Sequence, residues 1–249
     1  MTSLMGVRGN MTAWLCALTA LLALTLAACG GDDEGGSPTP SRTGPTLEPA
    51  LEQQLRELLG KWTAAETKIT YNLHSVIGSQ SQDGQLVYYQ QPPSVREDIV
   101  KTGSTTAYLV LPETAYACAA YPNVNPSCAI VPADEAQSAI VGAPLVQRPT
   151  ATSIDDLLAQ TLSLAAAPEQ QVLGRSTTCI TLTLPFGQLT TEATGCFTDD
   201  GLLLSETSTS PVSTYTLTAT QSEQPQQGDF EAPYPIVTAP PSATQPPAS

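Results

Sequence analysis

Thr178–Phe186 (TCITLTLPF) shows the clearest alternation of apolar and polar side chains in the chain. Thr181 and Thr183 separate its apolar positions, which are Ile180, Leu182, Leu184 and Phe186. Successive side chains of a β-strand point to opposite faces, so this spacing predicts a strand with one apolar face. An apolar face needs a cover, and the stretch therefore predicts a sheet that packs against other elements.

The same two-residue period recurs before this stretch and predicts five strands. These cover Lys68–Ser75, Gln85–Gln90, Ser94–Val100, Thr105–Leu111 and Thr114–Ala119. Asp83-Gly84 and Thr102-Gly103 carry residues typical of turns and are expected to connect neighbouring strands. Short connections of this kind predict an antiparallel meander.

Strands are also expected around and after the quoted stretch. Gln170–Gly174 leads into it, and Gln188–Thr198 is expected to pair with it. Asp200-Gly201 is a strong hairpin signal and predicts a turn into another strand. Asp199 and Asp200 could instead begin a calcium loop, but the further oxygen ligands that such a loop needs at regular spacing are missing from the sequence. The last expected strand has an apolar side formed by Tyr215, Leu217 and Ala219.

Three segments have helical character. Pro49–Glu66 is amphipathic, with a proline suited to a helix start and Trp62 as its expected anchor in the core. Ala133–Ala143 is rich in alanine, and Ser153–Leu164 is a better helix candidate, which Ser153 would cap. The acidic pair in the first turn of the latter segment, Asp155 and Asp156, is expected to complement the helix dipole rather than to act as catalytic carboxylates.

The order of elements predicts an α+β fold: a helix, five strands, one or two helices and about four more strands. The apolar strand faces are more extensive than one short helix can cover. We therefore expect a strongly curved antiparallel sheet, a half-open barrel, with helices packed in or over its concave face. A sheet of that shape can enclose an apolar hollow.

The N-terminus carries the signals of export and lipid attachment. Arg8 is followed by the uncharged apolar run Trp14–Leu26, as in a secretory signal peptide. A transmembrane anchor would need a longer run. Ordinary cleavage before Cys29 would need a small residue at Leu26. Leu-Ala-Ala-Cys instead resembles the bacterial lipobox, in which the cysteine is acylated and becomes the new N-terminus. We expect an anchor at Cys29 on the extracytoplasmic side of a bacterial cell membrane.

The organisation of the chain follows from its composition. Residues 1–28 are the expected signal peptide, and residues 29–46, rich in Gly, Pro, Ser and acidic residues, the expected disordered tether. Residues 47–236 form one domain, a length that suits a single core, and residues 237–249 are an expected disordered Pro-rich tail.

The charge of the chain argues against several partners. The formal net charge is -14, with only 9 Lys and Arg residues and no basic run. Phosphate neutralisation, on which nucleic-acid binding depends, is therefore not expected, and a basic patch for anionic lipid headgroups is absent from the sequence. Acidity of this kind most simply keeps an exported protein soluble.

Four cysteines lie in the expected domain and allow three disulfide connectivities. The favoured one pairs Cys118 with Cys128 and Cys179 with Cys196, because each pair closes a short loop between neighbouring strands. Such bridges persist outside the cytoplasm. A four-cysteine zinc site is the alternative, but its ligands usually form close Cys-x-x-Cys pairs.

A set of segments resembles the LolA-like superfamily of lipoprotein and lipid carriers, and within it the exported mycobacterial lipoproteins of the LppX and LprG kind. The lipobox cysteine comes first, followed by LLGKW, ITYNLHS, GQLVYYQQPPSVREDI and YLVLPETAYAC, and the closing segments are CFTDDGLLLSE and DFEAPYP. The resemblance depends on the order of two short motifs: Pro92-Pro93 followed by Arg96, and later Phe230 followed by Pro233. The resemblance covers most of residues 51–235. It implies a half-open antiparallel barrel closed by helices, which holds acyl chains of lipids or lipoproteins. The two cysteine pairs are not a general feature of that family.

Catalytic motifs are not evident. His74, the only histidine, lies among polar positions of a strand, and no Gly-rich phosphate loop, Ser-x-x-Lys or Gly-x-Ser-x-Gly occurs. We expect a monomeric non-enzyme without metal or cofactor that binds, and can transfer, lipid or acylated cargo. The residues expected to line its hollow are Ile69, Tyr71, Leu73, Leu109, Ile180, Leu182, Leu184, Phe186, Tyr215 and Leu217. The alternative is an envelope sensor or interaction module with a filled core and a protein partner, because the same fold serves in regulators of envelope stress signalling.

Overall fold

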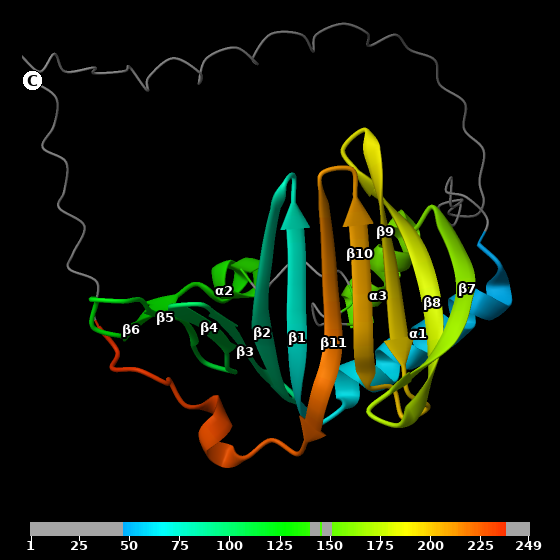
Figure 1. Cartoon of the computed structure of the whole chain (residues 1–249). Helices are drawn as coiled ribbons and strands as arrows, with labels where there is room; N and C mark the ends of the chain where they lie inside the picture. Colours follow the sequence, from blue (N-terminus) through cyan, green and yellow to red (C-terminus); the bar gives the residue numbers. More distant parts are fainter. Residues whose placement is uncertain (1–46, 140–144, 146–150, 238–249) are drawn as a thin grey trace, which may run out of the picture. The chain divides into compact units, whose positions relative to one another are not determined.

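The computed structural model describes residues 47–139, 145 and 151–237, which form one curved sheet with helices on its concave side (Figure 1). The second half of the expected helix Ala133–Ala143, from residue 140 onward, lies outside these residues. The helices are α1 (Pro49–Ala64), α2 (Ala133–Ala139), α3 (Ala151–Gln160) and the 3-10 turn η1 (Gln227–Phe230). The strands are β1 (Thr67–Ile77), β2 (Gln80–Gln91), β3 (Ser94–Lys101), β4 (Ser104–Val110), β5 (Ala115–Ala120), β6 (Ser127–Val131), β7 (Ser163–Val172), β8 (Arg175–Phe186), β9 (Leu189–Phe197), β10 (Leu203–Ser210) and β11 (Ser213–Glu223).

Two meanders make up the eleven-stranded antiparallel sheet, whose order is β6-β5-β4-β3-β2-β1-β11-β10-β9-β8-β7. Within each meander, strands that follow each other in sequence are neighbours in space. The two meanders join where β1 pairs with β11, from Lys68 opposite Glu223 to Ile77 opposite Ser213. This seam lies at the middle of the sheet (Figure 1). The structure thus confirms the predicted curved, open antiparallel sheet with helices.

Helix α1 packs its apolar stripe against the sheet because its leucines recur at helical spacing. Leu55, Leu58, Leu59 and Trp62 are buried. The ring of Trp62 stacks on Tyr88, with centroids 5.3 Å apart. Gln90 ties the end of the helix to the sheet, because its Nε2 donates to Trp62 O at 2.6 Å and to Ala65 O at 2.8 Å. These contacts fix α1 across the concave face, as the amphipathic pattern predicts.

The first hairpin turns earlier than the sequence suggests. Its turn lies at Gly78, which has a positive φ of 59°, and the predicted turn residues Asp83 and Gly84 lie inside β2. The expectation of a turn at Asp83-Gly84 is therefore wrong. Gly84 serves a different purpose, since a Cβ there would lie 2.6 Å from Val100 O of the neighbouring strand. A glycine within a strand marks such a close backbone approach.

The pattern misses β6 and predicts only the end of β7, at Gln170–Gly174. Helix α3 begins at Ala151 and ends at Gln160, so Ser153 lies inside the helix instead of capping it, and Leu164 belongs to β7. The predicted helix Ser153–Leu164 is thus wrong at both ends. The alanines of β7 favour a helix in isolation, but Leu164 pairs with Leu182 of β8, and the sheet decides the conformation.

Both favoured disulfides are present. Cys118 lies directly opposite Cys128 in β5 and β6, and Cys179 lies directly opposite Cys196 in β8 and β9. Each bridge therefore joins neighbouring strands, and the second lies within the stretch that shows the clearest alternation. Together they cross-link one hairpin in each meander.

The turn between β9 and β10 packs against α1. Gly201 of this turn has φ +86°, and Lys61 Nζ donates to Asp199 O at 2.7 Å. Asp200 accepts hydrogen bonds from Thr198 Oγ1 and, at 2.5 Å, from Arg175 Nη2. The predicted hairpin is confirmed. Among the described residues, no group of three or more His, Cys, Asp and Glu side chains could hold a metal ion.

Candidate functional site

The concave face of the sheet gathers most of the residues expected to line a binding site. One cluster of buried residues contains Ile69, Tyr71, Leu73, Ile180, Leu182 and Leu217, and Tyr215 packs against it. These residues come from both meanders, and the β1–β11 seam brings them together. Leucines of α1 and α3, among them Leu59 and Leu158, belong to the same cluster.

Three expected lining residues lie elsewhere. Leu109 is fully buried, but it belongs to a second cluster with Ala107, Cys118 and Cys128 on the other face of the sheet. Phe186 is exposed at the tip of the β8–β9 hairpin, and Leu184 is only half-buried. The alternation places Leu184 and Phe186 on the correct face, but the strand extends beyond the core. Leu109 is the cross-strand partner of Arg96, and cross-strand partners share a face of the sheet. Its side chain therefore lies on the convex side, as the Arg96 side chain does.

The concave face also carries two fully buried carboxylates, Glu97 and Glu206. Glu97 shares a face with Val95 and Ile99 of β3, and Glu206 Oε1 accepts a hydrogen bond from Leu145 N at 3.1 Å. The sequence analysis did not single out either residue. The available signal was position, since Glu97 occupies an apolar position in the alternation of its strand.

Tyrosine hydroxyls border these carboxylates. Tyr71 Oη donates to Leu203 O at 2.6 Å, and Tyr88 Oη donates to Gln90 Oε1 at 3.1 Å. Burial raises the pKa of Tyr71 well above its ordinary value, with further contributions from Tyr88 and the two glutamates. Burial raises the pKa of Tyr215 as well, and Glu97 and Glu206 raise it further. Tyr71 and Tyr215 therefore stay protonated, and each keeps an O–H that can donate a hydrogen bond.

Two hydrogen-bond donors on this side of the sheet lack partners in the described part of the chain. Trp62 Nε1 and Tyr215 Oη are both buried from solvent and have no hydrogen-bond partner. Leaving a buried donor unsatisfied costs about 1–3 kcal/mol, so such atoms are rare in folded proteins. An apolar face with isolated donors matches an amphiphilic ligand, whose chains are apolar and whose ester or headgroup oxygens accept hydrogen bonds.

His74 lies on the opposite face from these groups. Its ring is exposed, and Nδ1 lies 2.6 Å from Asp83 Oδ1 of the neighbouring strand. The buried Leu73 and the exposed His74 are consecutive, so their side chains point to opposite faces. The histidine is thus separated from the buried carboxylates by the sheet itself, as expected of a residue on the outer face.

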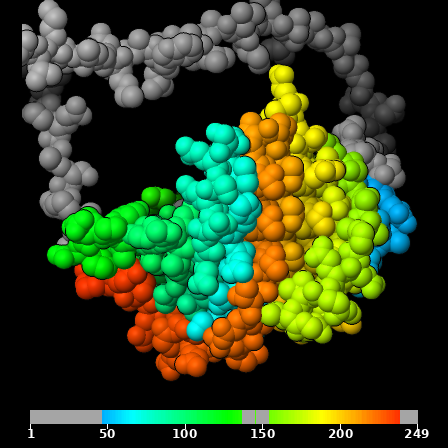
Figure 2. All heavy atoms as spheres, in the orientation of Figure 1, coloured from blue at the N-terminus to red at the C-terminus, as the bar shows by residue number. Residues whose placement is uncertain are grey.

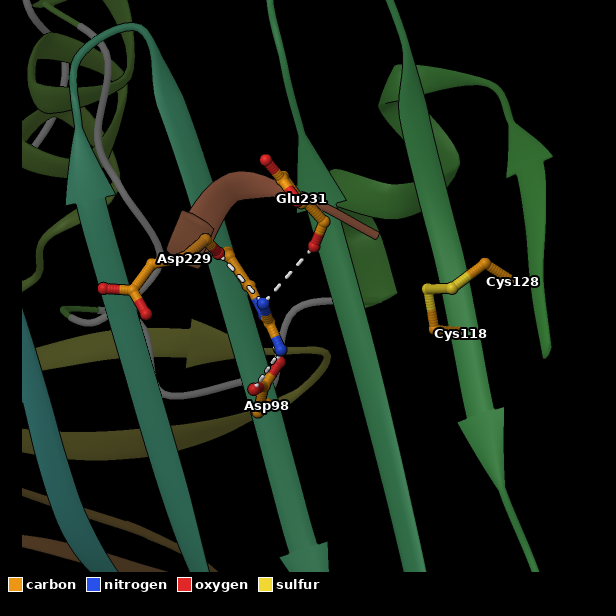
Figure 3. Close-up of a disulfide and its surroundings, with 6 residues drawn as sticks. Asp98, Cys118, Cys128, Asp229 and Glu231 are labelled. Atoms are coloured by element: carbon orange, nitrogen blue, oxygen red, sulfur yellow. Dashed lines mark hydrogen bonds and ion pairs between the residues drawn. A yellow bond between two sulfur atoms is a disulfide. The ribbon is translucent and has the colours of Figure 1, made fainter. Parts of the chain in front are cut away.

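The convex face holds a second, polar cluster around Arg96. Its guanidinium forms two hydrogen bonds of 2.7 Å to the carboxylate of Asp98 and lies 4.9 Å from the ring centroid of Tyr89. Arg96 Nη1 also donates to the backbone oxygens of Asp229, at 2.9 Å, and Glu231, at 3.4 Å (Figure 3). Burial, together with the charge of Asp98, raises the pKa of Tyr89 to about 12.

Arg96 thereby binds the segment 227–237, which we call the C-terminal strap. Farther along the strap, Cys128 N donates to Pro235 O at 2.9 Å, and Val237 N donates to Cys128 O at 2.8 Å. Ala232 and Tyr234 cover Leu109 and the Cys118–Cys128 disulfide. The two motifs on which the resemblance rests, Pro92-Pro93 with Arg96 and Phe230 with Pro233, therefore meet in the structure. Arg96 donates to the backbone oxygens on either side of Phe230.

No helix of the described residues is both long and apolar enough to cross a membrane. This finding concerns residues 47–139, 145 and 151–237 and leaves the anchor expected at Cys29 as a proposal.

No protein-family model and no curated protein matches the chain. Solved structures do match. The lipoprotein LppX of Mycobacterium tuberculosis is 15% identical, with 72% of this chain and 98% of that chain covered and a TM-score of 0.48. MucB is 14% identical, with 75% of this chain and 64% of that chain covered and a TM-score of 0.50. LprF of Mycobacterium bovis is 13% identical, with 73% and 98% covered and a TM-score of 0.41.

Identities this low speak to the fold alone. The chain shares its fold with MucB, and it spans about two thirds of the length of the MucB chain. The fold that the resemblance implied is therefore confirmed.

Proposed function

We propose that the chain is a membrane-anchored extracytoplasmic lipoprotein that binds a lipid or an acylated cargo on its apolar concave face. Cys29 is the proposed attachment site, and the chain acts without catalysis. The same residues that build the buried cluster, including Ile69, Leu182 and Leu217, would contact the acyl chains.

The observation that carries this proposal is the pair of buried donors, Trp62 Nε1 and Tyr215 Oη, which have no partner among the described residues. Two carboxylates lie near Tyr215, so a ligand there would meet donors and acceptors together. Apolar side chains alone would also fill a closed core. Donors without partners favour a ligand that places oxygen acceptors beside them.

Native mass spectrometry tests the proposal. The domain from Thr46 onward, exported as a soluble form without Cys29, is expected to carry a co-purifying mass that solvent extraction identifies as lipid. A clean apo mass, together with failure to take up added phospholipid, would contradict lipid binding.

Tyr215→Phe separates a ligand donor from a core residue. Among the described residues the hydroxyl has no partner, so its removal is expected to leave the free energy of unfolding unchanged or to raise it by about 1 kcal/mol. Affinity for the co-purifying lipid is expected to fall several-fold, because the ligand loses a hydrogen bond worth about 1 kcal/mol. Urea denaturation and lipid titration measure the two quantities.

Tyr121→Phe is the matched control, because Tyr121 is half-exposed and outside the concave cluster. It should change neither quantity. Equal lipid affinity of Tyr215→Phe and the parent chain would show that the Tyr215 hydroxyl does not contact the ligand.

Acylation of Cys29 has its own test. Cells that express the full chain and are fed a radioactive fatty acid are expected to yield a labelled mature protein, and Cys29→Ser should abolish the label. A mature protein that stays unlabelled and is released from the membrane would refute the anchor.

The second candidate is a non-catalytic envelope sensor with a protein partner. Its support is the fold shared with MucB, a protein that has been crystallised in complex with MucA. This candidate predicts a filled core, no lipid uptake, and a partner recovered with the anchored chain. Lipid uptake by the soluble domain therefore distinguishes the two functions.

A further inference from the structure

We propose that the hairpin tips at one end of the strands form a membrane-contacting surface that inserts apolar side chains into the outer part of a lipid bilayer. The surface consists of Ile77, Phe186, Leu189 and Val212, which we call the apolar rim. It is distinct from the concave face and from Cys29, and it would give the folded domain a defined orientation on the membrane.

The apolar rim lies at the tips of three hairpins, β1–β2, β8–β9 and β10–β11, which point to the same end of the sheet (Figures 1 and 2). Large apolar side chains at these tips are between 51% and 65% exposed. Exposed apolar residues are ordinary when they are scattered. Here, four of them occupy tips that the strand order makes neighbours.

A backbone hydrogen bond joins two of the three tips. Gly78 N of the β1–β2 turn donates to Val212 O of the β10–β11 turn at 3.0 Å. An open groove of about 540 Å³ between these turns is lined by Ile77, Pro211 and Val212, among others. The β8–β9 hairpin continues past the end of β10, since Glu192 stands opposite Thr209 and Phe186 and Leu189 lie beyond that pair. Two of the three tips are thus joined to each other, and the third hairpin projects beyond them.

Charge distinguishes this end of the sheet from the rest of the chain. Residues 76–82, 184–191 and 208–214, which form the three tips, contain no charged side chain, whereas the chain has 23 acidic and 9 basic residues. Charged groups begin directly below the tips, at Asp83 and Glu192, and Lys101 Nζ donates to Gln82 Oε1 at 3.1 Å. The turns at the opposite end of the strands carry Glu113, Asp199 and Asp200. An acidic chain is repelled by anionic lipid headgroups, so an uncharged apolar end is the part that can approach a bilayer closely.

The occupant is therefore a lipid surface rather than a charged macromolecule. Serine, threonine and glutamine flank the apolar residues and can bond to headgroups without a charge. The proposed tether also permits the contact, because the 19 residues between Cys29 and Pro49 span up to about 65 Å when extended.

Vesicle co-sedimentation of the mature chain without the acyl group tests this surface independently of the anchor. The chain with Cys29→Ser, exported behind an ordinary signal peptide, is expected to bind phosphatidylcholine vesicles. Phe186→Ser with Leu189→Ser, and separately Ile77→Ser with Val212→Ser, should each lower the partition coefficient about tenfold. Circular dichroism confirms that each variant keeps its fold.

The matched control replaces two exposed apolar residues away from the rim, Ile130→Ser with Leu173→Asn, and should leave the partition coefficient unchanged. Leu189→Trp should raise it and shift the tryptophan emission to the blue on vesicle addition, because tryptophan favours the membrane interface. Added phosphatidylglycerol should weaken binding at low salt, and salt should restore it.

Absence of binding to either vesicle, or equal loss in the rim and control variants, would overturn the proposal. So would binding that requires anionic lipid and disappears in salt. Lipid co-purification with the domain, which reports on the concave face, is unaffected by any of these outcomes, so the two proposals fail separately.

Discussion

Replacing Arg96 with alanine is expected to lower the free energy of unfolding by about 3–5 kcal/mol, because it leaves a carboxylate without its partner on the covered convex face. The Arg96 and Asp98 side chains are only 12% and 11% exposed, and they share a bidentate pair of hydrogen bonds. The variant also removes the donor to Asp229 O and Glu231 O. The C-terminal strap should therefore detach before the sheet unfolds.

Urea denaturation measures the stability, and hydrogen exchange at the amides of Cys128 and Val237 reports the strap. Arg175→Ala is the matched control, since Arg175 pairs with Asp200 on an exposed surface, where the loss should stay below about 1 kcal/mol. Arg96→Ala with Asp98→Ala should recover part of the stability. A loss from Arg96→Ala no larger than that from Arg175→Ala would show that Arg96 does not hold the strap.

Gly201→Ala is expected to cost about 3 kcal/mol or more. Two effects combine: the residue has φ +86°, which strains any side chain, and a Cβ would lie 2.2 Å from Lys61 Cβ and 3.1 Å from Trp62 N. Helix backbone cannot yield as a flexible side chain can. The substitution should therefore push α1 away from the β9–β10 turn and loosen the stacking of Trp62 on Tyr88.

Gly174→Ala isolates the strain from the contact. Gly174 has φ +72° but nothing within 4 Å of the added Cβ, so its loss should be about 1 kcal/mol. Thermal and urea denaturation of the two variants give the difference, and near-ultraviolet circular dichroism reports the environment of Trp62. Equal losses for the two glycines would mean that the approach of α1 to the turn contributes nothing.

The sequence predicted the α1 stripe, most strands and both disulfides because each depends on a local pattern. It failed where a tertiary contact decides the outcome. The alanine-rich start of β7 favours a helix until β8 pairs with it, and Leu109 lines the convex cluster because of its register opposite Arg96. Glu97 faces inward because its neighbours Val95 and Ile99 require that face, against the preference of a carboxylate for water.

The C-terminal strap was equally beyond local patterns. Its contacts with Arg96 and Cys128 use backbone oxygens and a backbone N–H, so no side-chain periodicity announces where it docks. Only the resemblance connected the two signature segments, and it did so without showing how they touch.

Because β1 pairs with β11, the sheet cannot close until the last strand is available. Lys68 and Glu223 are register partners although more than 150 residues separate them. A chain that emerges N-terminus first during synthesis presents β1 long before β11 arrives, and the exposed edge of β1 is a template for association with other chains. Completion of the sheet therefore waits for the last strand. A chain that stops before Ser213 leaves open edges on β1 and β10, which β11 would otherwise pair with.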